Sequence, residues 1–146
     1  MTRTTPASRI LFVAATLVLT LALAPAALAG KGHGGGGSTS AGGGSISLVV
    51  ETDLNGNGLP NYGDTIRFQV STTVSSSPYV VVTCKQGGAT VYTAQAGYYP
   101  SYPWPNDFIL TAPTWAPGPA GCTASLRYLS NGKWITITST TFDVRA

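Results

Sequence analysis

The chain has 146 residues, of which 43% are hydrophobic, 10% aromatic and 9% charged, with a formal net charge of +3. This length suits one folded domain and leaves no room for a second core. Binding to nucleic acid needs clustered Lys and Arg, and this chain lacks such clusters, so we expect no nucleic-acid partner.

Residues 1–29 have the pattern of a secretory signal peptide. Arg3 and Arg9 precede an apolar stretch over 10–24, and Ala-Leu-Ala at 27–29 forms a small-x-small cleavage site. A transmembrane anchor is the alternative, but the apolar stretch is shorter than the roughly 20 residues that span a bilayer. Cleavage removes Arg3 and Arg9 and lowers the formal net charge from +3 to +1. We expect a secreted, extracellular product with no membrane insertion after cleavage.

The folded domain is expected over residues 45–146. Residues 30–44 are almost entirely Gly, Ser and Thr, a composition that predicts a flexible leader. After the leader, apolar side chains recur at every second position, which is the period of a β-strand. The first two runs of this kind are Ile46, Leu48 and Val50, and Ile66, Phe68 and Val70.

The connection between these two strands, residues 53–64, matches a twelve-residue calcium loop. It has oxygen side chains at positions 1, 3 and 5, a glycine at 6, a main-chain carbonyl at 7 and a carboxylate at 12. The predicted ligands are Asp53, Asn55, Asn57, Leu59 and Asp64. Two carboxylates and flanking strands predict weak affinity, roughly 10⁻⁴ to 10⁻³ M. The alternative is a turn whose Asp and Asn side chains bond their own backbone. No cofactor is required.

The next apolar alternation, Val80, Val82 and Cys84, predicts a strand that a Gln-Gly-Gly turn joins to a second strand over 89–93. Residues 97–107 then carry four aromatic residues and three prolines. Rings on a proline-stiffened loop can stack on sugar faces, and Asn106 or Asp107 could bond hydroxyls. The predicted ligand-binding residues are Tyr98, Tyr99, Tyr102 and Trp104. The alternative is that these rings cover an open edge or end of the fold.

Three more strands are expected before the C-terminus. Phe108 and Leu110 begin a short strand, and a longer strand starts near Cys122. Asn-Gly at 131–132 ends the longer strand in a tight hairpin, because these residues tolerate the positive φ that the turn requires. The last strand is expected to direct Ile135 and Ile137 inward, with a bulge across 139–141. Trp115 and Trp134 are assigned to packing.

The two cysteines, Cys84 and Cys122, are expected to form one structural disulfide, as in other exported chains. In sandwich order they lie near the end of strand C and the start of strand F, which are antiparallel neighbours. A reactive or metal-binding thiol pair is disfavoured because no further ligand is near. The pattern predicts an all-β, immunoglobulin-like antiparallel sandwich of about seven strands; a small closed barrel is the alternative.

Two short motifs carry a resemblance to known proteins. The phrase from Asp53 to Phe68, D-x-N-G-x-G followed by G-D-x-I-x-F, resembles immunoglobulin-like repeat modules of bacterial surface and secreted proteins. The segment from Trp115 to Leu126 is similar to small secreted single-domain proteins of high-GC Gram-positive bacteria. The resemblance implies a fold, a place outside the cell and structural or adhesive roles, and it brings no catalytic residues.

Enzyme motifs are lacking. The domain has no histidine for a Ser or Cys triad, no phosphate-binding glycine motif and no zinc cluster, so we expect no enzyme. The first hypothesis is a non-enzymatic module that interacts with a cell-surface or matrix component. The second is a carbohydrate-binding module that uses the aromatic loop over 98–104 to bind polysaccharide. A small hydrolase dependent on Asp107 is the third.

Overall fold

The computed structural model describes residues 39–40 and 43–146, and this part of the chain contains strands and no helix. The strands are β1 (Thr39–Ser40), β2 (Gly44–Thr52), β3 (Thr65–Thr72), β4 (Tyr79–Gln86), β5 (Ala89–Gly97), β6 (Phe108–Ile109), β7 (Ala120–Ser130) and β8 (Lys133–Val144). None of the described residues belongs to a helix long and apolar enough to cross a membrane.

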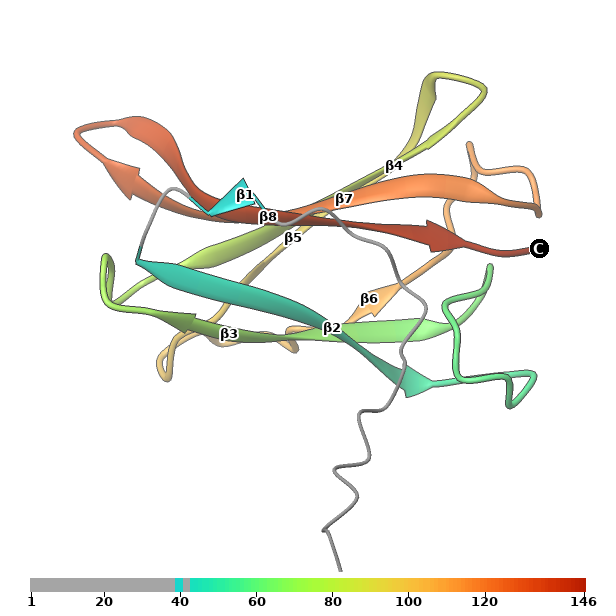
Figure 1. Cartoon of the computed structure of the whole chain (residues 1–146), viewed down its shortest axis with the longest axis horizontal. Coiled ribbons are helices and arrows are strands. Elements are labelled where there is room, and N and C mark those ends of the chain that lie inside the picture. Colours follow the sequence, from blue (N-terminus) through green and yellow to red (C-terminus); the bar gives the residue numbers. More distant parts are fainter. Residues whose placement is uncertain (1–38, 41–42) are drawn as a thin grey trace, which may run out of the picture. The chain divides into compact units, whose positions relative to one another are not determined.

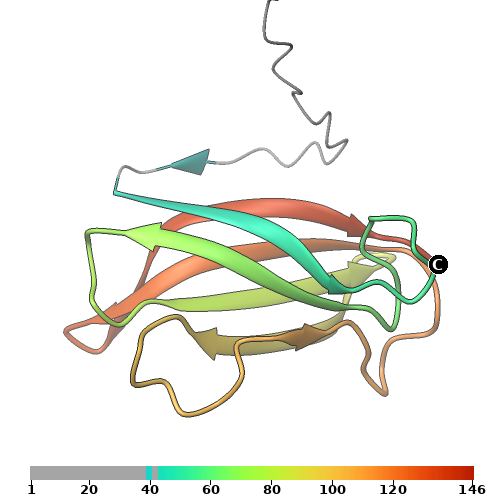
Figure 2. The ribbon, with the colours of Figure 1, turned by 90° about the horizontal axis from the view of Figure 1, so that it is seen from below.

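The strands form two antiparallel sheets (Figures 1 and 2). The larger sheet has the order β1-β8-β7-β4-β5, and the smaller one has the order β2-β3-β6. In the lettering of immunoglobulin folds, β4, β7 and β8 are strands C, F and G, and β5 lies beside β4 as strand C′. The smaller sheet then contains strands A, B and E. This order confirms the predicted immunoglobulin-like β-sandwich, with seven strands in its two layers and the two-residue β1 added beside β8.

Period-two alternation directs one apolar face of each sheet into a shared core. From the larger sheet, Val80 and Val82 are fully buried, while Tyr79 and Val81, which alternate with them, point to the outer face. From the smaller sheet, Ile66 and Phe68 are buried, and Phe68 contacts the ring of Phe108 edge to face at 5.6 Å between centroids. The inward residues of β3 and β4 are therefore the ones that the apolar alternation predicts.

The last strand departs from the predicted alternation. Ile137 is buried as expected, but Ile135 is 41% exposed. The register shows why, because Leu126 pairs with Thr138 while the next residue, Arg127, pairs with Thr136. Ile137 is thus the extra residue of a β-bulge, and a bulge reverses the side-chain alternation on one side of it. The expectation that Ile135 faces inward was wrong, and the bulge lies before the 139–141 run.

The structure also shows strands inside the expected leader, residues 30–44. Thr39 and Ser40 pair with Ser139 and Thr138 at the β8 edge, and β2 begins at Gly44. The signal segment 1–29 and most of the leader lie outside the described residues. The first β-pairing therefore begins six residues before the expected domain boundary at 45.

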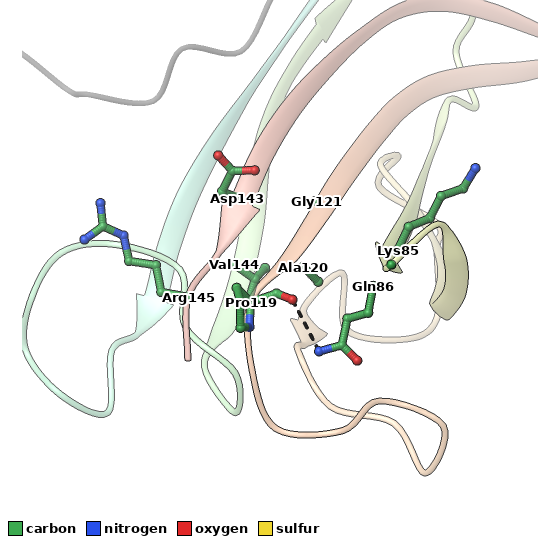
Figure 3. Close-up of a pocket in the computed structure, with 9 residues that line it drawn as sticks. Lys85, Gln86, Pro119, Ala120, Gly121, Asp143, Val144 and Arg145 are labelled. Atoms are coloured by element: carbon green, nitrogen blue, oxygen red, sulfur yellow. Dashed lines mark hydrogen bonds between the residues drawn. The ribbon is translucent and has the colours of Figure 1, made fainter.

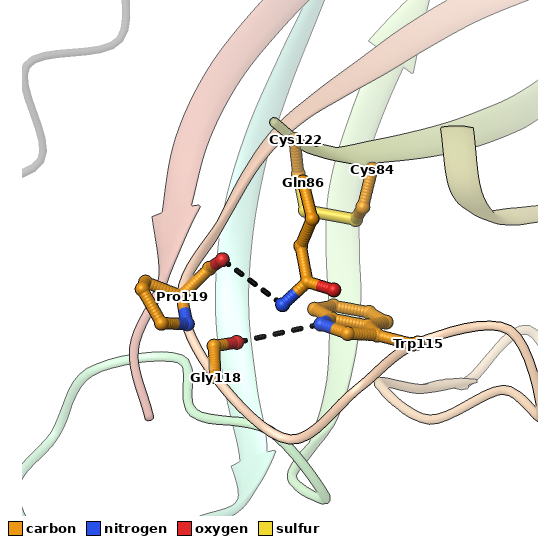
Figure 4. The surroundings of a disulfide bond; sticks show 6 residues. All are labelled: Cys84, Gln86, Trp115, Gly118, Pro119 and Cys122. Carbon is orange, nitrogen blue, oxygen red and sulfur yellow. Dashed lines mark hydrogen bonds between the residues drawn. A yellow bond between two sulfur atoms is a disulfide. The ribbon is translucent and has the colours of Figure 1, made fainter. Parts of the chain in front are cut away.

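The predicted disulfide joins two directly opposed residues of β4 and β7, with 4.0 Å between the Cα atoms of Cys84 and Cys122 (Figure 4). Both residues are buried on the core side of the sheet. Beside them Trp115 is buried, and its indole Nε1 donates to the carbonyl of Gly118 at 3.3 Å. Gln86 holds the same loop by donating to the carbonyl of Ala116 at 2.9 Å. The loop after β6 thus covers this end of the core, as the packing role predicted for Trp115 requires.

Candidate functional site

A chain of aromatic rings lies at the end of the larger sheet opposite the disulfide. We call it the aromatic patch, and its members are Tyr79, Tyr99, Tyr102, Trp104 and Trp134. Each ring contacts the next edge to face, with centroids 5.4 to 6.1 Å apart. The most exposed members are the two tryptophans at its ends, Trp104 at 68% and Trp134 at 41%. Three half-buried tyrosines therefore separate two solvent-exposed indole rings.

Three predicted ligand residues, Tyr99, Tyr102 and Trp104, come together in this patch. The structure adds Tyr79 from β4 and Trp134 from β8, which the sequence analysis missed. Trp134 had been assigned to packing, and its ring does contact Tyr79 and lie beneath the guanidinium of Arg127, 5.8 Å away, but it does so on the outer surface. No local motif marks these two residues, because only the pairing of distant strands brings them to the loop.

Gly97, the last residue of β5, makes the close packing of the loop possible. A Cβ atom there would meet the ring of Tyr102 and would lie 2.6 Å from Cε1 of Tyr99, closer than real contacts allow. The loop turns back between these tyrosines, since the amide of Tyr102 donates to the carbonyl of Tyr99 at 3.0 Å. The hydroxyls of Tyr79 and Tyr99 lie 2.7 Å apart, and this hydrogen bond raises the pKa of Tyr99 to about 12.

Tyr98 lies apart from the patch and has a different role. Its hydroxyl accepts from the amide of Phe68 at 3.0 Å and donates to the carbonyl of Asn106 at 3.0 Å. Phe68 is in β3 beyond the short pairing with β6, so Tyr98 satisfies a donor on an otherwise open strand edge. Burial raises the pKa of Tyr98 to about 12. Of the four predicted ligand residues, this one fulfils the alternative, edge-covering role.

The far end of the aromatic loop is fixed by ion pairs. Arg67 of β3 contacts Asp107 through Nη2 at 2.6 Å and Nε at 2.8 Å, and it contacts Glu51 of β2 at 3.4 Å. The carboxylate of Asp107, considered above as a partner for sugar hydroxyls or as a hydrolytic group, is thus engaged with the smaller sheet. The loop runs along one side of the sandwich from one sheet to the other (Figure 2).

A shallow groove crosses the outer face of β4 and β7. We call it the outer groove, and its lining residues are Val81, Thr83, Lys85, Thr123, Ser125 and Arg127. The register places Thr83 between Thr93 of β5 and Thr123 of β7, and Thr123 opposite Thr141 of β8. A row of four threonines therefore crosses the sheet. Its hydroxyls make no side-chain hydrogen bond within the described part of the chain, so they are available to a ligand.

At the disulfide end, a second concavity includes Lys85, Gln86, Asp143 and Arg145 in its lining (Figure 3). Lys85 and Asp143 flank Gly121 in the register, one on each neighbouring strand. No cluster of three or more His, Cys, Asp or Glu side chains occurs among the residues that the structure describes.

The 53–64 loop is closed by its own hydrogen bonds. The carboxylate of Asp53 accepts the amides of Asn55, Gly56 and Gly58 at 3.2, 2.8 and 2.5 Å. These bonds, that of Gly58 first, lower the pKa of Asp53 because they favour the charged form. Asp64 is fully buried and accepts the amide of Leu54 at 2.9 Å. Both carboxylates therefore act as backbone acceptors, as the turn interpretation predicts.

The other predicted ligands converge on one atom, the amide nitrogen Nδ2 of Asn61. This atom lies 3.5 Å from Oδ1 of Asn55, 3.2 Å from Oδ1 of Asn57, 2.6 Å from the carbonyl oxygen of Leu59 and 3.2 Å from Oδ2 of Asp64. Four of the five predicted ligand oxygens thus surround a single point. Sequence reasoning missed Asn61, although it occupies position 9 of the motif, which often contributes through water.

No family model, curated protein or solved structure matches this chain significantly. The class of protein therefore rests on its own fold, which is an immunoglobulin-like β-sandwich with one disulfide inside the larger sheet. A buried disulfide is typical of proteins that fold in an oxidising compartment.

Proposed function

We propose that this chain is a secreted, non-enzymatic module that binds a component of the cell surface or extracellular matrix through the aromatic patch. The observation that carries the proposal is the exposure of Trp104 and Trp134 on rings that are otherwise packed in a fixed order. Exposed aromatic residues in a well-packed surround are the side chains that most often supply binding energy at a surface.

Polysaccharide is the ligand class that this surface favours. A sugar ring has an apolar face that stacks on an aromatic ring and hydroxyls around it that need hydrogen-bond partners. The patch offers two separated indoles, and the threonine row, four residues along β4 from Tyr79, offers hydroxyls that can both donate and accept. A protein partner would bury the patch under a larger apolar area, whereas the outer face between the patch and the threonine row is mainly polar, with Gln95, Ser125 and Ser139 beside Val81.

The non-enzymatic part of the proposal is supported by the placement of the acids. Asp53 and Asp64 accept backbone amides, and Glu51 and Asp107 pair with Arg67. The chain has five acidic residues, so Asp143 is the one that remains. Glycoside hydrolysis ordinarily requires two carboxyl groups facing each other across the bond, and the two acids that lie near each other here, Glu51 and Asp107, are both paired with Arg67.

The test is sedimentation of the purified protein with cell-wall material and with insoluble polysaccharides. Wild-type protein should sediment with at least one of them, and Trp104→Ala and Trp134→Ala should each reduce the bound fraction with no change in melting temperature. Ile109→Ala is the matched control, because it removes an exposed apolar side chain, 57% exposed, from the smaller sheet. Sedimentation that is absent throughout, or equal for all variants, would refute binding through the patch.

We also propose weak calcium binding by the 53–64 loop, favoured by the four oxygens around Asn61 Nδ2. The ion would have to displace this amide, which accounts for weak affinity. At tenfold excess over its dissociation constant, calcium should stabilise the fold by about 1.4 kcal/mol and raise the melting temperature by several degrees. Asp64 is part of the fold without metal, so Asn57→Ala is the better test variant. An unchanged melting temperature in 10 mM calcium against chelator would rule out the site.

A further inference from the structure

The outer groove carries positive charge, and one acidic residue, Asp143, lies near its Lys85 end. Lys85 and Arg127 line it, and the strands that form its face, β4, β5, β7 and β8, contain a single acidic residue, Asp143 at the disulfide end. Within the described part of the chain neither Lys85 nor Arg127 forms an ion pair, since both salt bridges there belong to Arg67. The two cations are thus available to a ligand.

Arg127 connects the groove with the aromatic patch. It lies opposite Tyr79 in the β4–β7 register, and its guanidinium lies over the ring of Trp134 at 5.8 Å. Its Nε is buried and has no hydrogen-bond partner among the described residues. An unpartnered buried donor is costly, and a ligand oxygen that reaches it would remove this cost.

We propose that the outer groove binds an acidic polysaccharide, whose carboxylate or other anionic groups contact Arg127 and Lys85 while its sugar rings stack on the aromatic patch. This inference rests on the proposed function and specifies its ligand. Lys85 faces Gly121, and Arg127 faces Tyr79, six residues earlier in β4. The backbone positions of the two cations therefore lie about 20 Å apart at the rise of a strand. Between them Thr83, Thr123 and Ser125 supply hydroxyls for neutral parts of the polymer.

Charge complementarity favours this occupant over a neutral glycan. A neutral polymer could use the tryptophans and threonines but would leave the two cations and the buried Nε without partners. A charged ligand group on Arg127 forms charge-assisted hydrogen bonds, which are stronger than those between neutral groups.

The experiment compares acidic polymers with neutral polymers of the same sugar backbone. Affinities of immobilised full-length protein are measured for polygalacturonate and its methyl ester, and for carboxymethyl and hydroxyethyl cellulose, at low and at 0.5 M salt. We expect the acidic member of each pair to bind about tenfold or more tightly at low salt and to lose this advantage at high salt. Arg127→Gln should reduce the acid-to-neutral ratio about tenfold, and Lys85→Gln should reduce it less because Lys85 is exposed whereas Arg127 is half-buried.

Arg145→Gln is the matched control, since it makes the same change in net charge outside the outer groove, where its backbone pairs with Asn61. Equal affinity for both members of each pair would overturn the acidic-ligand inference while leaving the proposed function intact. If Arg127→Gln and Arg145→Gln reduced the charge preference equally, the outer groove would not be the site at which the acidic polymer binds. Binding to none of the four polymers would also overturn the inference, and sedimentation with cell-wall material would then decide the proposed function separately.

Discussion

Replacing Tyr98 by Phe removes one oxygen atom and two hydrogen bonds from the edge of β3. The amide of Phe68 loses its acceptor and the carbonyl of Asn106 loses its donor, each bond being 3.0 Å long. Phe68 is 3% exposed, so water cannot readily replace the hydroxyl. A buried donor left unpaired costs about 1 to 3 kcal/mol, and we expect a loss of about 2 kcal/mol in the free energy of unfolding.

Urea denaturation measures this loss, with an unchanged slope showing that both states keep their compactness. Tyr128→Phe is the control, because Tyr128 is half-buried and its hydroxyl has no hydrogen bond within the described chain. Its change should stay within about 0.5 kcal/mol. An equally small change for Tyr98→Phe would refute the edge-closing role of Tyr98.

Alkaline pH gives a second readout of the same residue, and the other predictions are independent of it. Burial raises the pKa of Tyr98 and Tyr92 to about 12 from the ordinary 10.0, so both favour the protonated native state. Stability should therefore be complete below pH 10 and fall as the pH rises toward 12, and Tyr98→Phe should reduce this fall. Replacing Cys84 and Cys122 by Ala should cost about 4 kcal/mol in urea denaturation, from the 38-residue separation that the bond closes. Gly97→Ala should displace the rings of Tyr99 and Tyr102 and reduce polysaccharide sedimentation, with far-UV circular dichroism retained.

Much of the fold could be predicted because alternation and turn chemistry are local signals. Asn131 and Gly132 adopt φ of 50° and 74°, as the predicted Asn-Gly hairpin requires. The disulfide followed from strand order, since Cys84 and Cys122 occupy opposed positions of C and F. The position of the bulge could not be predicted, because the residues between Ile137 and Phe142, where the apolar alternation changes phase, are all Ser and Thr. Only the pairing with β7 shows that Ile137 is the extra residue.

The candidate site was predicted only in part, because only some of its residues are marked by a local signal in the sequence. Tyr99, Tyr102 and Trp104 were found because they are crowded into one loop. Tyr79 and Trp134 belong to strands that periodicity describes one at a time, so the patch that joins them to the loop depends on tertiary structure. Arg127 likewise became a candidate only when the register placed it opposite Tyr79 and above Trp134.

The disulfide has a consequence for resistance to proteolysis. Cys84 and Cys122 close a covalent ring that contains β5, the aromatic loop and β6. A protease that cuts once within residues 98–107 opens this ring without releasing either fragment, since the buried bond still joins them. The cut protein would migrate as one species on a non-reducing gel and as two after reduction. The aromatic loop can thus be nicked while β4 and β7 stay linked.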